Sequence, residues 1–201
     1  AGLSAAYYEL ASPSVLPDFA QLAPVLTGSV AAVNYPSTGG NFAGSGRADN
    51  VGAVFTGWLR VDQPGLYTLY LNSDDGSRLL VGTTPVVSND GLHGMVEASG
   101  TIALAAGRHA LRIEFFEAGG GAGCIARLEG PGIPRAPIAP ARLSRGGIVN
   151  RFDLTGDAYV DGNDLGVLLS AWGPGTGPTD FNRDGATDGI DLGELLGHWG
   201  G

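Results

Sequence analysis

The stretch that decides the fold is FTGWLRVDQPGLYTLYLNSDDGSRLLVG, residues 55–82. Three runs of β-branched, aromatic and aliphatic residues are separated there by QPG and SDDG, whose residues favour tight turns. Tyr67, Leu69 and Leu71 alternate with three side chains of the opposite parity, and a period of two places the two sets on opposite faces of a strand. The segment therefore predicts consecutive antiparallel strands joined by turns.

Similar runs continue to about residue 143, and thirty-five glycines and twelve prolines punctuate the chain. The further strands that we expect are GTIALAA (100–106), HALRIEFFEA (109–118) and CIARLEG (124–130). Short strands with Gly-, Asn- or Asp-containing turns indicate an antiparallel β-sandwich or barrel. Residues 25–40 show no clear period and are expected to wrap the sandwich as long loops. The Pro-spaced residues 133–141 are expected to end this domain.

The last fifty residues contain one twelve-residue pattern twice. Oxygen-bearing side chains stand at steps 1, 3, 5, 9 and 12, and step 7 offers its backbone carbonyl, which is how an EF-hand loop surrounds one Ca²⁺. The first set is Asp153, Thr155, Asp157, Tyr159, Asp161 and Asp164, and the second is Asp180, Asn182, Asp184, Ala186, Asp188 and Asp191. The duplication predicts two calcium sites.

The flanks of the two loops repeat as well. DLGVLLSAWG (164–173) aligns with DLGELLGHWG (191–200). Leucines and a tryptophan fall at i, i+3, i+4 and i+7 in each, which is one face of a helix. Neither loop is preceded by a convincing helix. The segment before the first loop is short and Gly-rich, and the segment before the second is rich in Gly and Pro. The pattern predicts two units, each a loop followed by a helix.

Residues 153–201 therefore resemble a type I dockerin, the duplicated calcium module that binds cohesin domains. The resemblance implies a small α-helical domain with two F-hand or EF-hand-like sites, two Ca²⁺ and a cohesin-like partner. Steps 10 and 11 of each loop read the partner in that family, and they are Gly162, Asn163, Gly189 and Ile190 here. Ile190 is expected to be the apolar anchor; the alternative is that it packs inward against the other helix.

The N-terminal part also resembles a known family. GLSAAYYEL, the stretch 55–82, NDGLHGM, GTIALAAGRHALRIEFFEAGGG and RLEGPGIP follow in the order typical of the protective-antigen-type (PA-fourteen) domain. The resemblance implies an antiparallel β-sandwich found in adhesins, surface proteins and glycosidases. In the adhesins two consecutive aspartates, joined by a cis peptide, hold a Ca²⁺ that also binds sugar hydroxyls, and Asp74 and Asp75 match them. The alternative is a hairpin turn with solvated carboxylates.

A calcium ion takes six to eight oxygen ligands, so two aspartates cannot complete its shell. Glu117, the carbonyls of residues 119–121, Asn89 and Asp90 are the further candidates for this ligand-binding site. Trp58, in the middle of a strand, is expected in the core rather than at a sugar. Glu114 and Glu117 lie three apart on a strand and face opposite ways, so they cannot form a glycosidase pair.

Charge and composition narrow the class of protein. Net charge is −9, of which residues 151–201 carry −7, so the acidic excess belongs to the calcium module. The sequence has no basic cluster of the kind that binds nucleic acid. It also has no run of eighteen apolar residues, the length that a membrane-spanning helix needs. Cys124 is the only cysteine and is expected to be a buried hydrophobe. The predicted domains are 1–143 and 153–201, with 144–152 as linker.

The sequence thus predicts a mainly β, extracellular, calcium-binding protein without catalytic activity. One hypothesis is a carbohydrate- or surface-recognising sandwich anchored by its C-terminal module to a cohesin-like domain. The other is a structural subunit of an extracellular fibre, in which the C-terminal module binds another copy of the chain. A third Ca²⁺ at Asp74 and Asp75 and a glycan partner belong to the first hypothesis.

Overall fold

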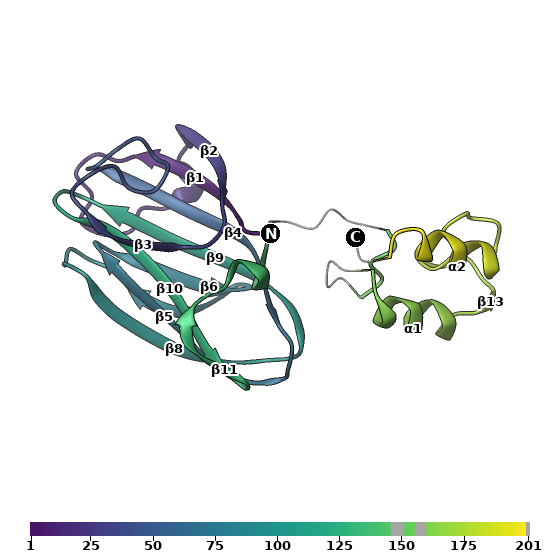
Figure 1. The fold of residues 1–201 in the computed structure, drawn as a ribbon. Coiled ribbons are helices and arrows are strands. Elements are labelled where there is room, and N and C mark those ends of the chain that lie inside the picture. The colour runs from purple at the N-terminus through teal and green to yellow at the C-terminus, as the bar shows by residue number, and fades with distance from the viewer. Residues whose placement is uncertain (146–150, 156–159, 200–201) are drawn as a thin grey trace. The chain divides into compact units, whose positions relative to one another are not determined.

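The computed structural model describes residues 1–145, 151–155 and 160–199. The chain divides into two compact units, Ala1–Gly146 and Gly147–Gly201. The first is built of antiparallel strands and the second carries the two helices (Figure 1). The prediction of a mainly β, antiparallel chain is confirmed.

The first unit forms two sheets that face each other (Figure 1). One has the order β2-β1-β4-β9-β6-β7, with β12 added beside β4, and the other β11-β10-β5-β8, with β3 beside β10. The strands of the first sheet are β1 (Leu3–Glu9), β2 (Leu26–Val30), β4 (Val51–Val61), β6 (Ser77–Val81), β7 (Thr84–Asn89), β9 (Gly107–Glu117) and β12 (Leu143–Ser144). Those of the second are β3 (Asn34–Thr38), β5 (Gly65–Asp74), β8 (Val96–Leu104), β10 (Ala122–Gly130) and β11 (Ile133–Pro137). Single 3₁₀ turns, η1 (Phe19–Gln21) and η2 (Pro140–Arg142), lie between them.

The main core lies between the two sheets and follows the predicted alternation. Tyr67, Leu69 and Leu71 of β5 are fully buried, as are Phe55 and Phe115 on the opposite sheet. Cys124 is buried in the same core, and burial raises the pKa of its thiol to about 12. A thiol in that state is a poor nucleophile, so this cysteine serves packing.

The prediction that residues 25–40 form long loops is wrong, because β2 and β3 lie within this range. β1 lies inside the first sheet between β2 and β4, and β3 pairs with β10. Most side chains of β2 and β3 are exposed, so these edge strands lack the apolar alternation that reveals a strand. Residues 133–137 also form a strand, and its prolines are tolerated because β11 is an edge.

The second unit has a small core of its own. Its elements are α1 (Gly162–Ser170), α2 (Gly189–Leu196) and the short strands β13 (Gly173–Pro174) and β14 (Ala186–Thr187). Leu168 and Leu195 are fully buried and belong to one core cluster with the buried Phe152. Trp172 and Trp199 lie on the surface. Within the described part of the chain, no helix combines the length and apolar character that crossing a bilayer requires.

Strands β7 and β8 approach each other where the two sheets meet at one side. A Cβ built on Gly100 of β8 would lie 1.8 Å from the carbonyl oxygen of Val86 in β7. A backbone oxygen cannot move aside as a side-chain terminus can. Gly28, on the edge strand β2, has nothing within 4 Å of its Cβ position and provides a matched comparison.

We expect Gly100→Ala to destabilise the sandwich by roughly 2 kcal/mol or more, because the methyl group would force the two strands apart. Gly28→Ala should change the free energy of unfolding by less than about 1 kcal/mol. Thermal unfolding of both variants, followed by the β-sheet circular dichroism signal, measures the difference. Equal melting temperatures would contradict the close approach of β7 and β8.

Candidate metal and ligand site

The turn between β5 and β6 carries the two aspartates that the sequence singled out. The Asp74–Asp75 peptide bond is cis, as the resemblance implied. Gly76 follows them because a Cβ there would lie 2.4 Å from the ring of Phe116 and 2.9 Å from the amide nitrogen of Gly91. The turn is therefore held tightly against β9 and the loop after β7.

Three carboxylates meet at this turn. Asp74, Asp75 and Glu117, the last residue of β9, each place a carboxylate oxygen within 4.8 Å of the other two. Both Asp75 oxygens accept backbone hydrogen bonds, from the amides of His93 (2.9 Å) and Ala118 (3.0 Å). These bonds fix the carboxylate and leave each oxygen a further lone pair.

Glu117 is the least satisfied member of the group. Its side chain is fully buried, and neither of its oxygens has a partner with hydrogen-bond geometry among the described residues. Burial and the charges of Asp75 and Asp74 raise the pKa of Glu117 to about 7, although nearby backbone amides partly oppose the rise. A buried carboxylate without a partner is costly, so this position favours a cation.

The two neighbouring ionisable groups respond to the same charges. Burial and the charge of Asp75 raise the pKa of Asp74, although a hydrogen bond from Ser37 opposes the rise. Burial opposes protonation of the His93 ring, but its two backbone carbonyl partners and the two aspartates outweigh that effect and raise the pKa of His93. The site thus gathers negative charge that a cation would neutralise.

A glycine loop after β9 closes the group on one side. A Cβ built on Gly121 would lie 2.7 Å from Ser37 Oγ and 2.9 Å from Asp74 Oδ2, so a larger residue there would displace these two side chains. The hydroxyl of Ser37 donates to Asp74 Oδ2 (3.2 Å), and Asp49 Oδ1 accepts from the amide of Gly120 (3.3 Å). The sequence did not reveal Ser37 or Asp49, because both come from loops or edge strands far from residue 74 in the chain.

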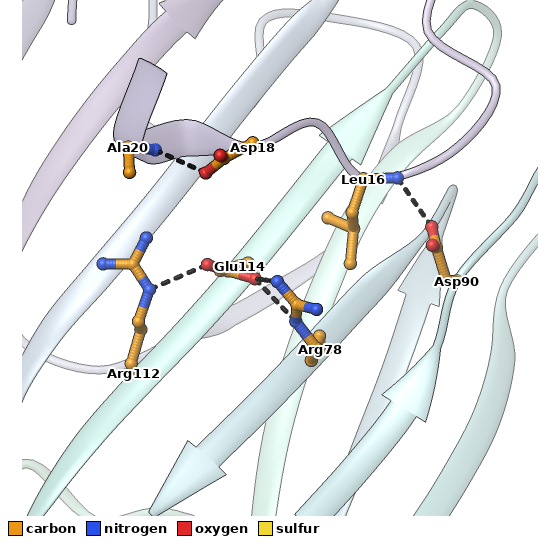
Figure 2. Close-up of polar contacts among 7 residues, drawn as sticks. All are labelled: Leu16, Asp18, Ala20, Arg78, Asp90, Arg112 and Glu114. Carbon is orange, nitrogen blue, oxygen red and sulfur yellow. Dashed lines mark hydrogen bonds and ion pairs between the residues drawn. The ribbon is translucent and has the colours of Figure 1, made fainter. Parts of the chain in front are cut away.

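The other two predicted ligands have different partners. The amide group of Asn89 donates to Ser73 Oγ (3.0 Å) and to the carbonyl of Val96 (2.9 Å). Asp90 Oδ1 accepts from the backbone amide of Leu16 (2.7 Å) and ties down the connection between β1 and β2 (Figure 2). Neither side chain belongs to the three-carboxylate group, and their ligand role stays a prediction.

The predicted loops of the second unit are only partly described. Asp157 and Tyr159 lie outside the described residues. In the first loop, Asp164 is fully buried and accepts hydrogen bonds from the backbone amides of Thr155 and Asp161. Asp153 interacts with other groups of the chain.

In the second loop, the equivalent Asp191 accepts from the amides of Phe181, Asn182 and Asp188. Burial would raise the pKa of Asp191, but those amides outweigh it and lower the pKa.

The second loop turns back on itself through backbone contacts. The carboxylate of Asp180 accepts from the amides of Asp184 (3.1 Å) and Gly185 (3.1 Å), and Gly185 has a φ of 94° that favours glycine. Asn182 and Asp184 accept amides two residues on, while Ala186 pairs with Pro174 through its backbone. Within the described part of this unit, no three carboxylates lie within 4.8 Å of one another.

The predicted partner-reading positions lie at the helix starts. Asp161 and Asp188 cap α1 and α2, and each forms a capping box with the aspartate three residues later. Ile190 is 57% exposed and does not pack inward. The other three positions, Gly162, Asn163 and Gly189, are exposed as well.

Comparison with known proteins identifies the class of the first unit. The family model described as the PA14 domain matches residues 34–138, more than half of the 201 residues. The chain belongs to the PA14 domain family, which confirms the resemblance of its N-terminal part. No curated protein matches the sequence.

Solved structures support this fold. A PA14 sugar-binding domain from an RTX adhesin shares 22% identity at a TM-score of 0.62, covering 72% of this chain and 98% of that one. The Epithelial Adhesin 9 A domain from Candida glabrata, in complex with Galβ1-3GlcNAc, shares 11% identity at 0.55, covering 71% and 87%. An anti-sigma factor domain-containing protein shares 20% at 0.62; it covers 73% of this chain, which spans only 48% of that protein.

In buffer free of divalent cations, we expect the melting temperature of the sandwich to fall by about 5 °C as pH rises from 5 to 8. The pKa of Glu117 in the folded state, about 7, lies above the unfolded value. Stability present below the unfolded pKa is therefore lost as pH rises through the folded pKa. Scanning calorimetry at several pH values measures the trend.

Glu117→Gln should flatten that pH dependence and be more stable than the original chain at pH 8. The control is Glu129→Gln, an exposed glutamate of β10 that should leave the trend intact. A Glu117→Gln curve that follows the original chain would show that Glu117 does not titrate in this range.

Proposed function

We propose that the chain is a non-catalytic, calcium-dependent recognition protein that acts outside the cell. The PA14 domain recognises carbohydrate or another surface component, and the C-terminal module anchors it to a partner. The observation that carries the proposal is the group formed by the carboxylates of Asp74, Asp75 and Glu117, in which both buried oxygens of Glu117 lack a hydrogen-bond partner among the described residues.

Calcium fits this group better than a proton or a softer metal. Hard carboxylate and carbonyl oxygens are the ligands that Ca²⁺ prefers, and its irregular geometry suits a shell drawn from a turn, a strand end and a loop. Asp74, Asp75 and Glu117 would supply the carboxylates, and we propose that backbone carbonyls of residues 119–121 complete the shell. Ca²⁺ would also satisfy the buried oxygens of Glu117.

Carbohydrate recognition is supported by the family and its relatives. The RTX adhesin domain is described as sugar-binding, and the Candida glabrata domain was solved with Galβ1-3GlcNAc. A Ca²⁺ at Asp74 and Asp75 would keep open coordination positions that two vicinal sugar hydroxyls can occupy. These adhesins also favour an extracellular or surface location for the chain.

The C-terminal module is proposed to be dockerin-like, with two Ca²⁺ and a cohesin-like partner. Its support is the duplicated loop, the matching caps at Asp161 and Asp188 and the exposed Ile190. The second candidate is a fibre in which the module binds another copy of the chain. The exposed apolar side chains of Trp172 and Trp199 fit either partner.

The absence of catalysis belongs to the same proposal. Glu114 is held by Arg78 and Arg112 on the outer face of the first sheet (Figure 2). Glu117 belongs to the carboxylate group instead. The two glutamates therefore lie in different surroundings and would not act on one bond.

We expect native mass spectrometry to find three Ca²⁺ in the chain and two in the Asp74→Asn/Asp75→Asn variant. Glu117→Gln should weaken the third ion about tenfold or more, because it removes a charged ligand. Asp180→Ala is the control, since it should remove an ion from the C-terminal module and leave the sandwich ion. A count of two in both the original chain and the Asp74→Asn/Asp75→Asn variant would show that the turn holds no metal.

A glycan array with and without chelator then tests whether sugar binding needs the ion.

Ile190→Asp should abolish binding to an immobilised cohesin domain while the chain keeps all its Ca²⁺, because a carboxylate would replace an exposed apolar anchor. Asn163→Asp makes a comparable change on the first helix start and should weaken binding less. Sedimentation in calcium separates the two candidates: self-association that Ile190→Asp removes would support the fibre. Loss of the helical circular dichroism signal would mean that Ile190 stabilises the module instead.

A further inference from the structure

The outer face of the first sheet carries an open trough that the proposed calcium site does not use. It crosses β2, β1, β4 and β9 and has a volume of about 630 Å³. A second hollow of about 350 Å³ continues it along β4 and β9, and the two share Ser4, Thr56 and Arg112. We refer to both hollows together as the outer trough.

Strand register explains the floor of the outer trough. Ser29 of β2 pairs with Ser4 of β1, which pairs with Thr56 of β4, which pairs with Arg112 of β9. Three small hydroxyl side chains thus lie in one row across the sheet and end at an arginine. Such a row leaves depth above the sheet and offers hydrogen-bond donors and acceptors along it.

Aromatic side chains line the outer trough on opposite sides of this row, one in each direction along the strands. Tyr8 lines one end and packs against Phe19 of the β1–β2 connection, with ring centroids 4.9 Å apart. Trp58 lines the other end. The expectation that Trp58 belongs to the core is wrong, because its side chain is partly exposed and lies on the outer face with Thr56.

The outer trough is basic. Arg112 uses Nε to bind Glu114 (2.7 Å), and its two terminal nitrogens make no hydrogen bond with any described residue. Arg145, which lines the trough, has no ion pair within the described part of the chain. Glu114, the carboxylate that Arg112 binds, is buried and is shared with Arg78 (Figure 2). Among the described residues, no acidic side chain lines either hollow.

A third arginine lies beside the tryptophan. Arg108 covers one face of the Trp58 ring, with its guanidinium carbon 5.2 Å from the centroid, and donates to Ser144 Oγ (2.6 Å). This cation–π contact orients the indole and adds positive charge at that end. The trough therefore combines hydroxyls, an oriented aromatic ring and unshared guanidinium nitrogens.

We propose that the outer trough binds an acidic oligosaccharide, whose carboxylate or sulfate groups pair with Arg112 and Arg145 while a sugar ring packs on Trp58. Guanidinium groups bind planar oxyanions through paired hydrogen bonds. Aromatic rings pack against the apolar faces of sugars, and hydroxyl side chains bind their hydroxyls. A protein partner would instead favour large apolar anchors, which the floor lacks.

The site is independent of the calcium site and needs no metal. The test uses the full chain and affinity electrophoresis with three probes: hyaluronan for carboxylates, dextran sulfate for sulfates and neutral dextran as control. We expect at least one acidic probe to bind, with and without chelator, and 0.5 M salt to weaken it. Arg112→Gln/Arg145→Gln should weaken binding about tenfold or more. Arg135→Gln, on the other sheet, should bind as the original chain does.

Arg145→Gln alone guards against misfolding, since Arg145 is exposed and unpaired among described residues; it should weaken binding at an unchanged melting temperature. The proposal is overturned if neither acidic probe binds, if neutral dextran binds equally, or if the arginine variants bind normally. Binding that chelator removes and the arginine variants keep would assign sugar to the Asp74–Asp75 site instead. Self-association of the chain that the double variant removes, without acidic-probe binding, would assign the trough to a second copy.

Discussion

The antiparallel ladder between β4 and β9 is the constraint on which the rest of the sandwich depends. It runs without a shift from Val51↔Glu117 to Val61↔Gly107. Its parity places Phe55 and Phe115 in the core and sends Thr56 outward. A slip of one residue would exchange the faces, exposing core side chains and burying Arg112 of the outer trough. The apolar face therefore fixes the positions of polar groups that contribute nothing to the core.

The three-carboxylate group depends on the same ladder through the terminal pair Val51↔Glu117. Glu117 ends β9 on the same parity as Phe115, so its side chain faces inward and is fully buried. Asp75 is held there by two backbone amides, and Gly76 and Gly121 allow backbone to pass where a Cβ would collide. The cost of gathering three carboxylates is thus met by rigid backbone positions, which is how proteins pre-organise ligand sites.

Sequence patterns predicted the strands whose two faces differ, such as β5, and the turn that carries Asp74 and Asp75. They failed for β2 and β3, because edge strands with exposed side chains carry no apolar alternation. Trp58 was misplaced for a related reason. Periodicity shows that it shares a face with Thr56, but not whether another layer covers that face. The segment around Phe19 covers only the end of the outer face near Tyr8, a tertiary contact that no local pattern encodes.

Net charge alone would mislead about what the sandwich can bind. The chain carries −9, but most of that belongs to residues 151–201. Within the sandwich, carboxylates gather at the Asp74–Asp75 turn and arginines line the outer trough, and the net charge of the domain reveals neither group. Local fields decide binding, because salt screens charges beyond about 10 Å. The carboxylate group and the outer trough have no residue in common, so a cation at the turn and an anion in the trough would not compete for the same side chains.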